Sequence, residues 1–340
     1  MISPLGMVTG SINFWPTSPG REKKMITEII EAINEGCNFL ITSHIRLDGD
    51  ALGSELALFL LLQDLGKRVV VYNQDTTPEH YRFLPAAKNI VQEPGDVEQY
   101  DVAFVLDCSE LTRVGDQFAK IGKIKKLINI DHHISNGGFC EVRLIDAQAS
   151  STGELIFRLM SKMSVKITKD ISTNLYAAIL TDTGGFRYSN TNQEALRAAG
   201  VLVEKGADPQ WISENIYESD PPAKLKLLAR AMETLSLDLK MKIGSLVVTR
   251  KMLQETGASM DHTDGFVDIP RAVQGIEISV LYTQLNNNCF KLSLRSKGKV
   301  NVEKIAAKFG GGGHINAAAC RVEGDIESIK LKIREAVKEL

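Results

Sequence analysis

Short apolar runs alternate with helical patterns from residue 21 of this 340-residue chain, and no other feature constrains the fold as strongly. Four of the runs have the length and apolar content of buried strands. The runs span residues 37–44, 67–73, 101–107 and 125–131, and helical patterns precede the first two at residues 22–36 and 54–66. This alternation predicts an α/β domain with a mostly parallel sheet flanked by helices.

The predicted strands end in residues of the types that bind metal ions. His44 ends the first run, Asp107 ends the third, and the triplet Asp131-His132-His133 lies at the end of the fourth. In open parallel sheets, ligands bind beyond the carboxyl ends of the strands, so three such placements predict one shared site. Asp131 is interpreted as a carboxylate that orients the neighbouring histidine rings and not as a metal ligand.

A further acidic segment follows His44 directly. Asp48 and Asp50 lie four and six residues after it, and we expect a turn after the strand to bring the three side chains into one small volume. Gly49 and Gly53 in this segment permit a close approach of backbone segments.

Asp182 has a different setting. It lies near the end of a helical pattern over residues 171–186 that we expect to stop at Gly184, so the helix would present this aspartate from its last turn. Oxygen and imidazole ligands together suit Mn²⁺ or Mg²⁺. The predicted metal ligands are His44, Asp48, Asp50, Asp107, His132 and Asp182.

Asp107 is the candidate bridge between two metal ions. Two ions about 3.5–4 Å apart usually share a carboxylate, and such a pair stabilises the attacking and the leaving oxygen in phosphoryl transfer. Four aspartates would neutralise two divalent ions, so a phosphate substrate needs further donors. A glycine run after a helix is commonly only its C-cap, but an adjacent histidine favours substrate binding. The predicted donors are His133, Arg113, Arg295, Gly311, Gly312, Gly313 and His314.

The length of the chain exceeds what one hydrophobic core usually organises, which predicts two domains. Pro209 and the Pro221-Pro222 pair interrupt helical stretches and indicate a hinged connector. Beyond it, residues 277–296 predict a β-hairpin that turns at Asn286 to Asn288. The predicted organisation is a poorly ordered extension at residues 1–20, a metal-binding catalytic domain at 21–205, a helical linker at 206–240 and a smaller α/β substrate-binding domain at 241–340.

Two polar segments contain residue types that also occur in binding sites. Residues 261–270 contain three aspartates and a histidine, like a metal cluster, but they lack apolar flanks and are interpreted as a polar surface loop. The basic run at residues 120–126 is interpreted as the solvated face of a helix. Neither segment is expected to belong to the site.

Composition narrows the range of partners. The formal net charge of −2 argues against a surface that binds long nucleic acid through its phosphates, because such surfaces are usually strongly basic. No window approaches the roughly 18 apolar residues of a membrane span. Five scattered cysteines without a C-x-x-C pair favour a reduced cytoplasm. We therefore expect a cytoplasmic protein that acts on small substrates, with a homodimer left open.

Six segments of the chain resemble the DHH/DHHA1 phosphoesterase superfamily, and its nanoRNase and pAp-phosphatase (NrnA-like) branch is the most similar. The segments are SHIRLDGDALGS, VLDCSE, NIDHH, TDTGGFRYSNT, SLRS and FGGGGHINAAA, in the family's order within residues 24–340. The resemblance implies two Mn²⁺ ions, with Mg²⁺ as an alternative. One ion would be held by His44, Asp48 and Asp107, and the other by Asp50, Asp107, His132 and Asp182.

The same resemblance implies substrate contacts. It places His133 against the scissile phosphate. It also implies that Arg295 and residues 311–314 bind the phosphates and nucleotide of the substrate, and that Arg113 is a further substrate contact. Ala319 departs from the family pattern, in which a glycine closes this loop motif. If that glycine serves close backbone packing, Ala319 shifts the loop and changes substrate preference more than chemistry.

The implied function is Mn²⁺-dependent hydrolysis of short oligoribonucleotides, of 3′-phosphoadenosine 5′-phosphate to AMP, or of both, by a water that two metal ions activate. A phosphodiesterase for cyclic dinucleotides or their linear products has the same layout and stays an alternative. A manganese pyrophosphatase shares the metal motifs but lacks the glycine-rich loop. A catalytically silent nucleotide-binding regulator would be expected to have lost metal ligands, and all six positions are filled here.

Overall fold

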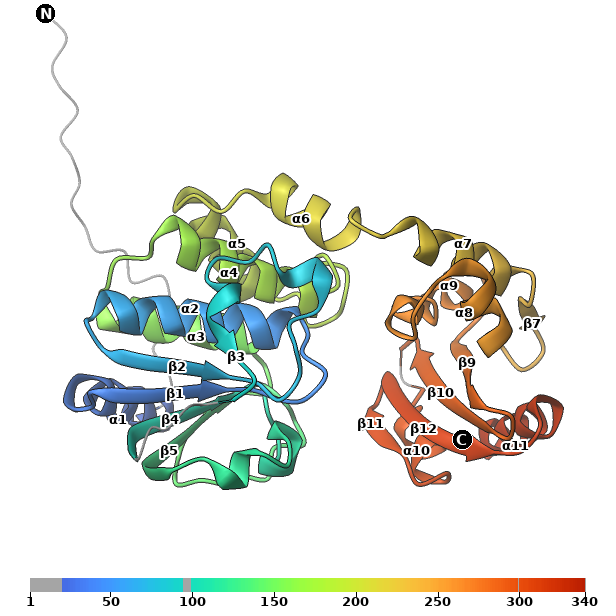
Figure 1. The fold of residues 1–340 in the computed structure, drawn as a ribbon, viewed down its shortest axis with the longest axis horizontal. Helices are drawn as coiled ribbons and strands as arrows, with labels where there is room; N and C mark the ends of the chain where they lie inside the picture. Colours follow the sequence, from blue (N-terminus) through green and yellow to red (C-terminus); the bar gives the residue numbers. More distant parts are fainter. Residues whose placement is uncertain (1–19, 94–98, 299, 340) are drawn as a thin grey trace, which may run out of the picture. The chain divides into compact units, whose positions relative to one another are not determined.

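The computed structural model describes residues 20–93, 99–298 and 300–339, and the chain forms two compact units that divide between Ser219 and Asp220 (Figure 1). Each unit has its own six-stranded sheet. The extension expected at residues 1–20 lies, apart from Gly20, outside the described residues. The other domain limits stay predictions. Across the described parts of the chain, no helix combines the length and the apolar character that crossing a membrane requires.

The sheet of the first unit is entirely parallel, with the strand order β3-β2-β1-β4-β5-β6. The predicted parallel α/β architecture is therefore confirmed. The sequence missed β3 and β6, which are only two and four residues long. The strands are β1 (Asn38–Thr42), β2 (Arg68–Tyr72), β3 (Ile90–Val91), β4 (Gln99–Leu106), β5 (Lys123–Asp131) and β6 (Val142–Ile145).

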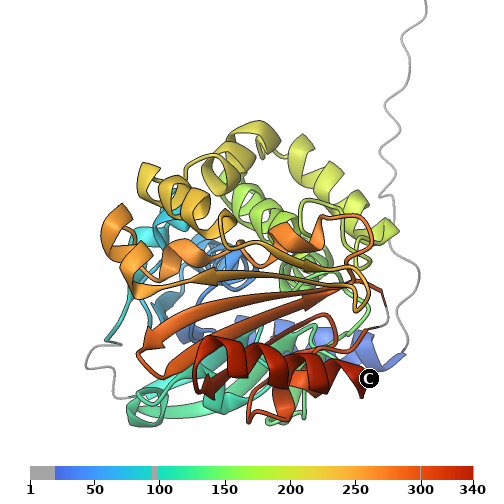
Figure 2. The same cartoon turned by 90° about the vertical axis from the view of Figure 1, so that its right-hand side faces the viewer.

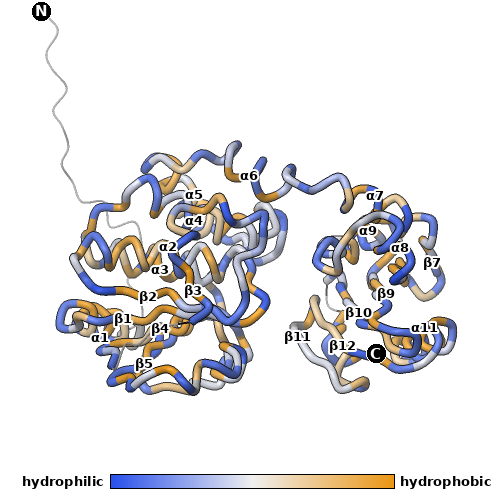
Figure 3. The backbone as a smooth tube through the Cα atoms, viewed as in Figure 1, coloured by the Kyte–Doolittle hydropathy of each residue, from blue (hydrophilic) through white to orange (hydrophobic). Residues whose placement is uncertain are grey.

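The two faces of this sheet are covered differently. Helices α1 to α4 share one core with Phe39 and Phe104, whereas Leu40 and Tyr100 belong to a second cluster that includes the 3₁₀ turn at Phe118. The strands between these layers are mainly hydrophobic (Figure 3). The helices are α1 (Gly20–Glu35), α2 (Gly49–Asp64), α3 (Thr152–Met163), α4 (Lys169–Asp182), α5 (Gln193–Glu204) and α6 (Pro209–Tyr217), and the 3₁₀ turns are η1 (Glu79–Tyr81), η2 (Ala87–Asn89), η3 (Leu111–Val114) and η4 (Phe118–Lys120).

The basic run at residues 120–126 is not a helix face, as the sequence had suggested. It enters β5, where Lys123, Lys125 and Lys126 are exposed at the start of the strand. The apolar half of β5 follows and is buried, so the strand changes from solvated to buried along its length. Such a change shows no regular hydrophobic period, which explains the wrong prediction.

Helix α2 begins at Gly49, five residues before the predicted helical pattern. Asp48 caps it by accepting a main-chain hydrogen bond from the first turn at 3.0 Å. A Cβ atom on Gly49 would lie 2.4 Å from Thr181 Oγ1, and one on Gly53 would lie 2.3 Å from Asn174 O. Both neighbours belong to α4, so these glycines allow the close backbone approach that the sequence analysis expected.

The second unit has a mixed sheet with the strand order β11-β12-β10-β9-β8-β7, in which β8 and β9 are the parallel pair. Helices α10 and α11 pack on one face over Leu292 (α11 lies in front in Figure 2), and α7 to α9 pack on the other over Leu246. The strands are β7 (Ser236–Asp238), β8 (Ile243–Val248), β9 (Ile278–Asn286), β10 (Cys289–Ser296), β11 (Gly312–His314) and β12 (Ala317–Glu323). The helices are α7 (Pro222–Met232), α8 (Arg250–Thr256), α9 (Asp268–Arg271), α10 (Glu303–Ala307) and α11 (Ile326–Lys338), with η5 (Asp261–Thr263) between α8 and α9.

Of two predictions for the second unit, one is confirmed and one is wrong. The hairpin over residues 277–296 is confirmed, since β9 and β10 pair as antiparallel neighbours. Residues 261–270 are not a polar surface loop, because they form η5 and the start of α9 and bury Phe266 and Val267 in a core. Two adjacent apolar residues show neither a helical nor a strand period, which explains the missed elements.

Replacing Gly53 with alanine should destabilise the first unit, because the added methyl group would overlap Asn174 O in α4. Overpacking of this kind costs about 1–3 kcal/mol. Gly200→Ala is the matched control: this helical glycine in α5 is exposed, and a Cβ atom there meets nothing within 4 Å. The control should be neutral or stabilising by less than about 1 kcal/mol. Urea unfolding compares the two variants, and equal midpoints would contradict the close helix packing.

Candidate active site

The candidate site lies at the carboxyl edge of the first sheet, where the strand order reverses between β1 and β4. His44 comes two residues after β1, Asp107 directly follows β4, and His132 directly follows β5. Asp50 lies in the first turn of α2, and Asp182 is the last residue of α4. The packing of these two helices therefore adds two carboxylates to the edge at which the three strands end.

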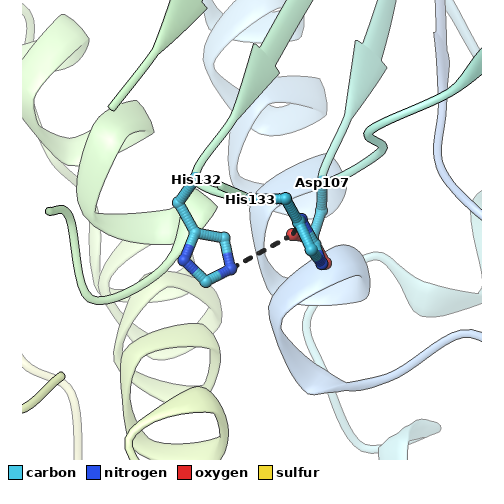
Figure 4. Close-up of side chains that lie close together, drawn as sticks. All are labelled: Asp107, His132 and His133. Carbon is cyan, nitrogen blue, oxygen red and sulfur yellow. Dashed lines mark ion pairs between the residues drawn. The ribbon is translucent and has the colours of Figure 1, made fainter. Parts of the chain in front are cut away.

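Asp107 is at the centre of this cluster. Its Oδ2 lies 3.3 Å from Nε2 of His44. Its Oδ1 lies 3.5 Å from Nε2 of His132, and Figure 4 shows this pair. Oδ1 also lies 3.5 Å from Nδ1 of His133, so the two oxygens of one buried carboxylate face different imidazoles: Oδ2 faces His44, and Oδ1 faces His132 and His133. The backbone of Asp107 has a φ of 52°, in the left-handed region, and its N–H donates a hydrogen bond to Ile130 O at 3.0 Å. Such a conformation persists only where the surrounding contacts determine it.

Two groups of potential ligands flank Asp107, and within each group the ligand atoms all lie within 4.8 Å of one another. Nε2 of His44 is 3.7 Å from Asp48 Oδ2. Nε2 of His132 is 3.6 Å from Asp182 Oδ2. Ligand atoms that bind one octahedral ion at about 2.1 Å lie about 3 Å from one another. Small side-chain movements would therefore bring the atoms of each group to the separation that such an ion requires. The groups are His44, Asp48 and Asp107, and Asp50, His132 and Asp182.

Burial, together with the charges of neighbouring groups, sets the protonation of the cluster. Burial and the charge of Asp107 raise the pKa of Asp50. Burial also raises the pKa of Asp182 to about 7, although the charge of His132 opposes this effect. Burial lowers the pKa of His44, but the hydrogen bond to Asp107 and the nearby carboxylate charges outweigh burial and raise it to about 9. The cluster is therefore short of positive charge, and divalent cations are the species that such carboxylates bind.

Asp131 holds the ring of His133. Nδ1 of His133 lies 2.6 Å from Asp131 Oδ1, and Asn136 donates a hydrogen bond to Asp131 Oδ2 at 2.6 Å. Burial lowers the pKa of His133, but the hydrogen bond to Asp131 and the charges of Asp107 and Asp131 together outweigh burial and raise it. These contacts agree with the interpretation of Asp131 as an orienting carboxylate. His133 also forms a third group of potential metal ligands with Asp107 and His132.

The predicted phosphate donors are spread over both units. Arg113 lies in η3 of the first unit, where its carbonyl oxygen accepts a hydrogen bond from Ile45 N at 2.7 Å. This bond ties η3 to the segment that follows β1. Arg295 lies on β10 of the second unit, Gly311 directly precedes β11, and Gly312 and Gly313 belong to β11. The side chain of His314 lies outside the part of the chain that the structure describes.

The glycines before His314 have different surroundings. A Cβ atom on Gly311 would lie 2.2 Å from Ala319 O, and one on Gly313 would lie 2.4 Å from Ala317 O. A Cβ atom on Gly312 would meet nothing within 4 Å. Ala319 pairs with Gly312 in the sheet, so β12 accommodates the alanine at this position. The fold therefore requires glycine at 311 and 313 but not at 312.

Sequence reasoning missed three residues that contact the predicted ligands. The N–H groups of Thr152 and Gly153 donate to Asp50 at 2.7 and 2.8 Å, and Asn190 donates to Asp182 Oδ2 at 3.1 Å. The Ser-x-x-Glu pattern from Ser151 to Glu154, which contains Thr152 and Gly153, does indicate the start of a helix. It does not indicate which carboxylate the helix start would meet.

The chain matches two family models, the DHH family N-terminal domain over residues 38–179 and the DHHA1 domain over residues 243–340. It is 32% identical over 317 residues to the bifunctional oligoribonuclease and PAP phosphatase NrnA of Thermus thermophilus, and the match covers 93% of each chain. The protein of the same name from Bacillus subtilis is 26% identical over 303 residues, which are 88% of this chain and 93% of that protein.

A solved structure shows the same fold. An exopolyphosphatase-related protein from Bacteroides fragilis has a TM-score of 0.88 and 27% identity over 93% of this chain and 96% of that one. Two family models in the expected order and a relative above 30% identity over nearly the whole length establish the family. The chain belongs to the DHH/DHHA1 phosphoesterases and, among them, to the NrnA branch.

Proposed function

We propose that this chain is a Mn²⁺-dependent phosphoesterase that hydrolyses short oligoribonucleotides, 3′-phosphoadenosine 5′-phosphate (pAp), or both. The activities named for its NrnA relatives support this proposal. One observation carries it: the two oxygens of Asp107 face two separate groups of ligands. In this arrangement one carboxylate would bridge two metal ions.

The side chains of the cluster fit a pair of divalent cations. Carboxylate and imidazole donors suit Mn²⁺ and Mg²⁺. The raised pKa values of Asp50 and Asp182 indicate an excess of negative charge that cations would offset. When bound, the two ions would lower the pKa of a water and neutralise charge on the phosphoryl group. One ion would be held by His44, Asp48 and Asp107, and the other by Asp50, Asp107, His132 and Asp182.

His133 would act on the substrate. The contact with Asp131 orients its ring and favours the protonated form. A protonated His133 would donate a hydrogen bond to a non-bridging phosphate oxygen or help to protonate the leaving group. The charge of Arg113 acts on the pKa of His133, which supports a place for this guanidinium among the phosphate donors.

The second unit would select the substrate through Arg295 and residues 311–314. Main-chain N–H groups in a glycine run can bind an anion. Because the fold does not require glycine at 312, the bare backbone there leaves room for a ligand. The net charge of −2 favours a short ligand over long nucleic acid.

We further propose that the reaction takes place in the cytoplasm. All five cysteines have free thiols, of which Cys108 and Cys320 are buried. Thiols in this state are usual in a reducing compartment. A homodimer stays a prediction.

Replacing Asp107 with asparagine keeps the shape of the side chain but removes the charge that two ions would share. We expect kcat for Mn²⁺-dependent hydrolysis of pAp to fall about 1000-fold or more, which corresponds to about 4 kcal/mol of transition-state stabilisation. The control is Asp64→Asn, an exposed carboxylate in the last turn of α2, which should keep full turnover. Turnover of Asp107→Asn near the control value would contradict the bridging role.

A hydrolysis panel with Mn²⁺ tests the substrate. It compares kcat/KM for a short RNA, pAp, a cyclic dinucleotide, its linear product and pyrophosphate. We expect the short RNA or pAp to have the highest value, as the relatives' names imply. A preference for the dinucleotides would indicate a phosphodiesterase, and a preference for pyrophosphate would indicate a pyrophosphatase. Binding without turnover of any member would indicate a regulator.

Alanine at Gly312 tests the substrate role of the glycine run. Gly312→Ala should fold with an unchanged unfolding midpoint but raise KM several-fold, because its methyl group would occupy space that the fold leaves open. Gly311→Ala should instead lower the unfolding midpoint, since its methyl group would overlap Ala319 O. A Gly312→Ala protein with unchanged KM would exclude this part of the run from the substrate site.

A further inference from the structure

One turn of the chain contacts two of the four predicted carboxylate ligands directly and is linked to a third, Asp182, through Asn190. This turn, here called the α3 turn, runs from Ser150 to Gly153 and enters the first turn of α3. Its side chains are buried, and Thr152 has no exposed surface. Asn190 links it to the last turn of α4, since its Nδ2 donates to Ser150 O at 2.9 Å and to Asp182 Oδ2 at 3.1 Å.

Thr152 contacts two carboxylates, Asp50 and Asp107, at once. Its N–H donates to Asp50 Oδ2 at 2.7 Å, and its hydroxyl donates to Asp107 Oδ1 at 3.1 Å. The N–H of Gly153 donates to Asp50 Oδ1 at 2.8 Å, so each oxygen of Asp50 has a main-chain donor. These N–H groups belong to the N-terminus of α3, where the helix dipole favours negative charge.

Glycine at 153 allows α3 to come this close to the site. A Cβ atom there would lie 2.5 Å from the Cβ atom of Ala178 in α4 and 3.4 Å from Asp50 Oδ1. A larger residue would push the helix start away from both neighbours. The hydrogen bonds of Thr152 therefore depend on close packing among α2, α3 and α4.

A buried network fixes the position of the α3 turn. Glu154 has no exposed surface and accepts hydrogen bonds from Ser150 N and Oγ at 2.8 and 2.7 Å. Arg158 forms ion pairs with Glu154 and, at 2.7 Å, with Asp146. Buried networks whose members are hydrogen-bonded to one another are rigid. The network therefore fixes the position of Thr152 relative to Asp107.

We propose that Thr152 is a positioning residue of the metal centre, whose hydroxyl sets the rotation of the Asp107 carboxylate so that one oxygen faces each ion. The inference rests on the proposed two-metal function. Rotation of a carboxylate about its last torsion is broad unless a partner holds it. With Oδ1 held by Thr152, Oδ2 faces His44 and Oδ1 still lies 3.5 Å from His132. Loss of such a partner typically weakens metal binding by about 10–100-fold.

The test is Thr152→Val, which removes the hydroxyl but keeps the volume and the N–H donor to Asp50. We expect Mn²⁺ binding, measured by isothermal titration calorimetry, to weaken about 10–100-fold. The melting temperature in the presence of EDTA should move no more than in Thr173→Val, a buried helical threonine whose hydroxyl donates a hydrogen bond to Lys169 O at 3.0 Å. Thr152→Ser should restore tight binding, because serine returns the donor.

The outcomes separate the two claims. Tight Mn²⁺ binding by Thr152→Val, or equally weak binding by Thr152→Val and Thr152→Ser, would overturn the positioning role. An unmodified chain that binds no Mn²⁺ would overturn the proposed function itself. If Thr152→Val does not fold, the pair Thr152→Ser and Thr152→Ala makes the same comparison, since these variants differ only in the hydroxyl. Weak binding by alanine alone would then support the proposal, and equal binding by both would overturn it.

Discussion

Repulsion among four aspartates is the constraint on which the rest of the site depends. Asp48, Asp50, Asp107 and Asp182 surround two imidazoles at one edge of the first sheet. Asp50 and Asp107 are buried, and burial strengthens the repulsion between them, because charges interact more strongly in a medium of low dielectric constant. Burial, with the charge of Asp107 as a further cause, raises the pKa values of Asp50 and Asp182, so their charged forms are disfavoured in the protein alone. Hydrogen bonds from the α3 turn offset part of this effect, and bound cations would offset the remainder.

Close packing of the sheet and helices holds these side chains together despite their repulsion. A parallel sheet brings His44, Asp107 and His132 to one edge, because the carboxyl ends of its neighbouring strands all lie there. Two glycines in α2 then let that helix approach α4, which carries Asp182. The contact that stabilises the unit is therefore also the contact that sets the geometry of the second ligand group. Stability and the proposed metal binding would therefore depend on the same helix interface.

The sequence was most informative where function follows directly from strand order. His44, Asp107 and His132 could be placed together because each one ends or follows an apolar run, and Asp182 because a Gly-Gly pair ends its helix. Asp50 was expected in a turn but lies inside α2, since Asp48 caps the helix earlier than the apolar pattern suggests. Gly49, Asp50 and Gly53 are weak helix formers, so the sequence does not indicate that α2 begins at Gly49.

Contacts across long sequence separations could not be predicted. Thr152 meets Asp107 across 45 positions of the chain, and only the packing of three helices brings them together. Local patterns also failed for β3, which is too short to show a period, and for the buried pair Phe266 and Val267. In each case tertiary packing, which a single sequence does not display, decided the outcome.

The central claim is that two metal ions share Asp107. Low-temperature electron paramagnetic resonance of the protein titrated with Mn²⁺ tests it most directly. The structure predicts two ions per chain with the multiline spectrum of an exchange-coupled pair, as expected for ions about 3.5–4 Å apart. A single bound ion, or two ions whose spectra are those of isolated Mn²⁺, would contradict the shared carboxylate.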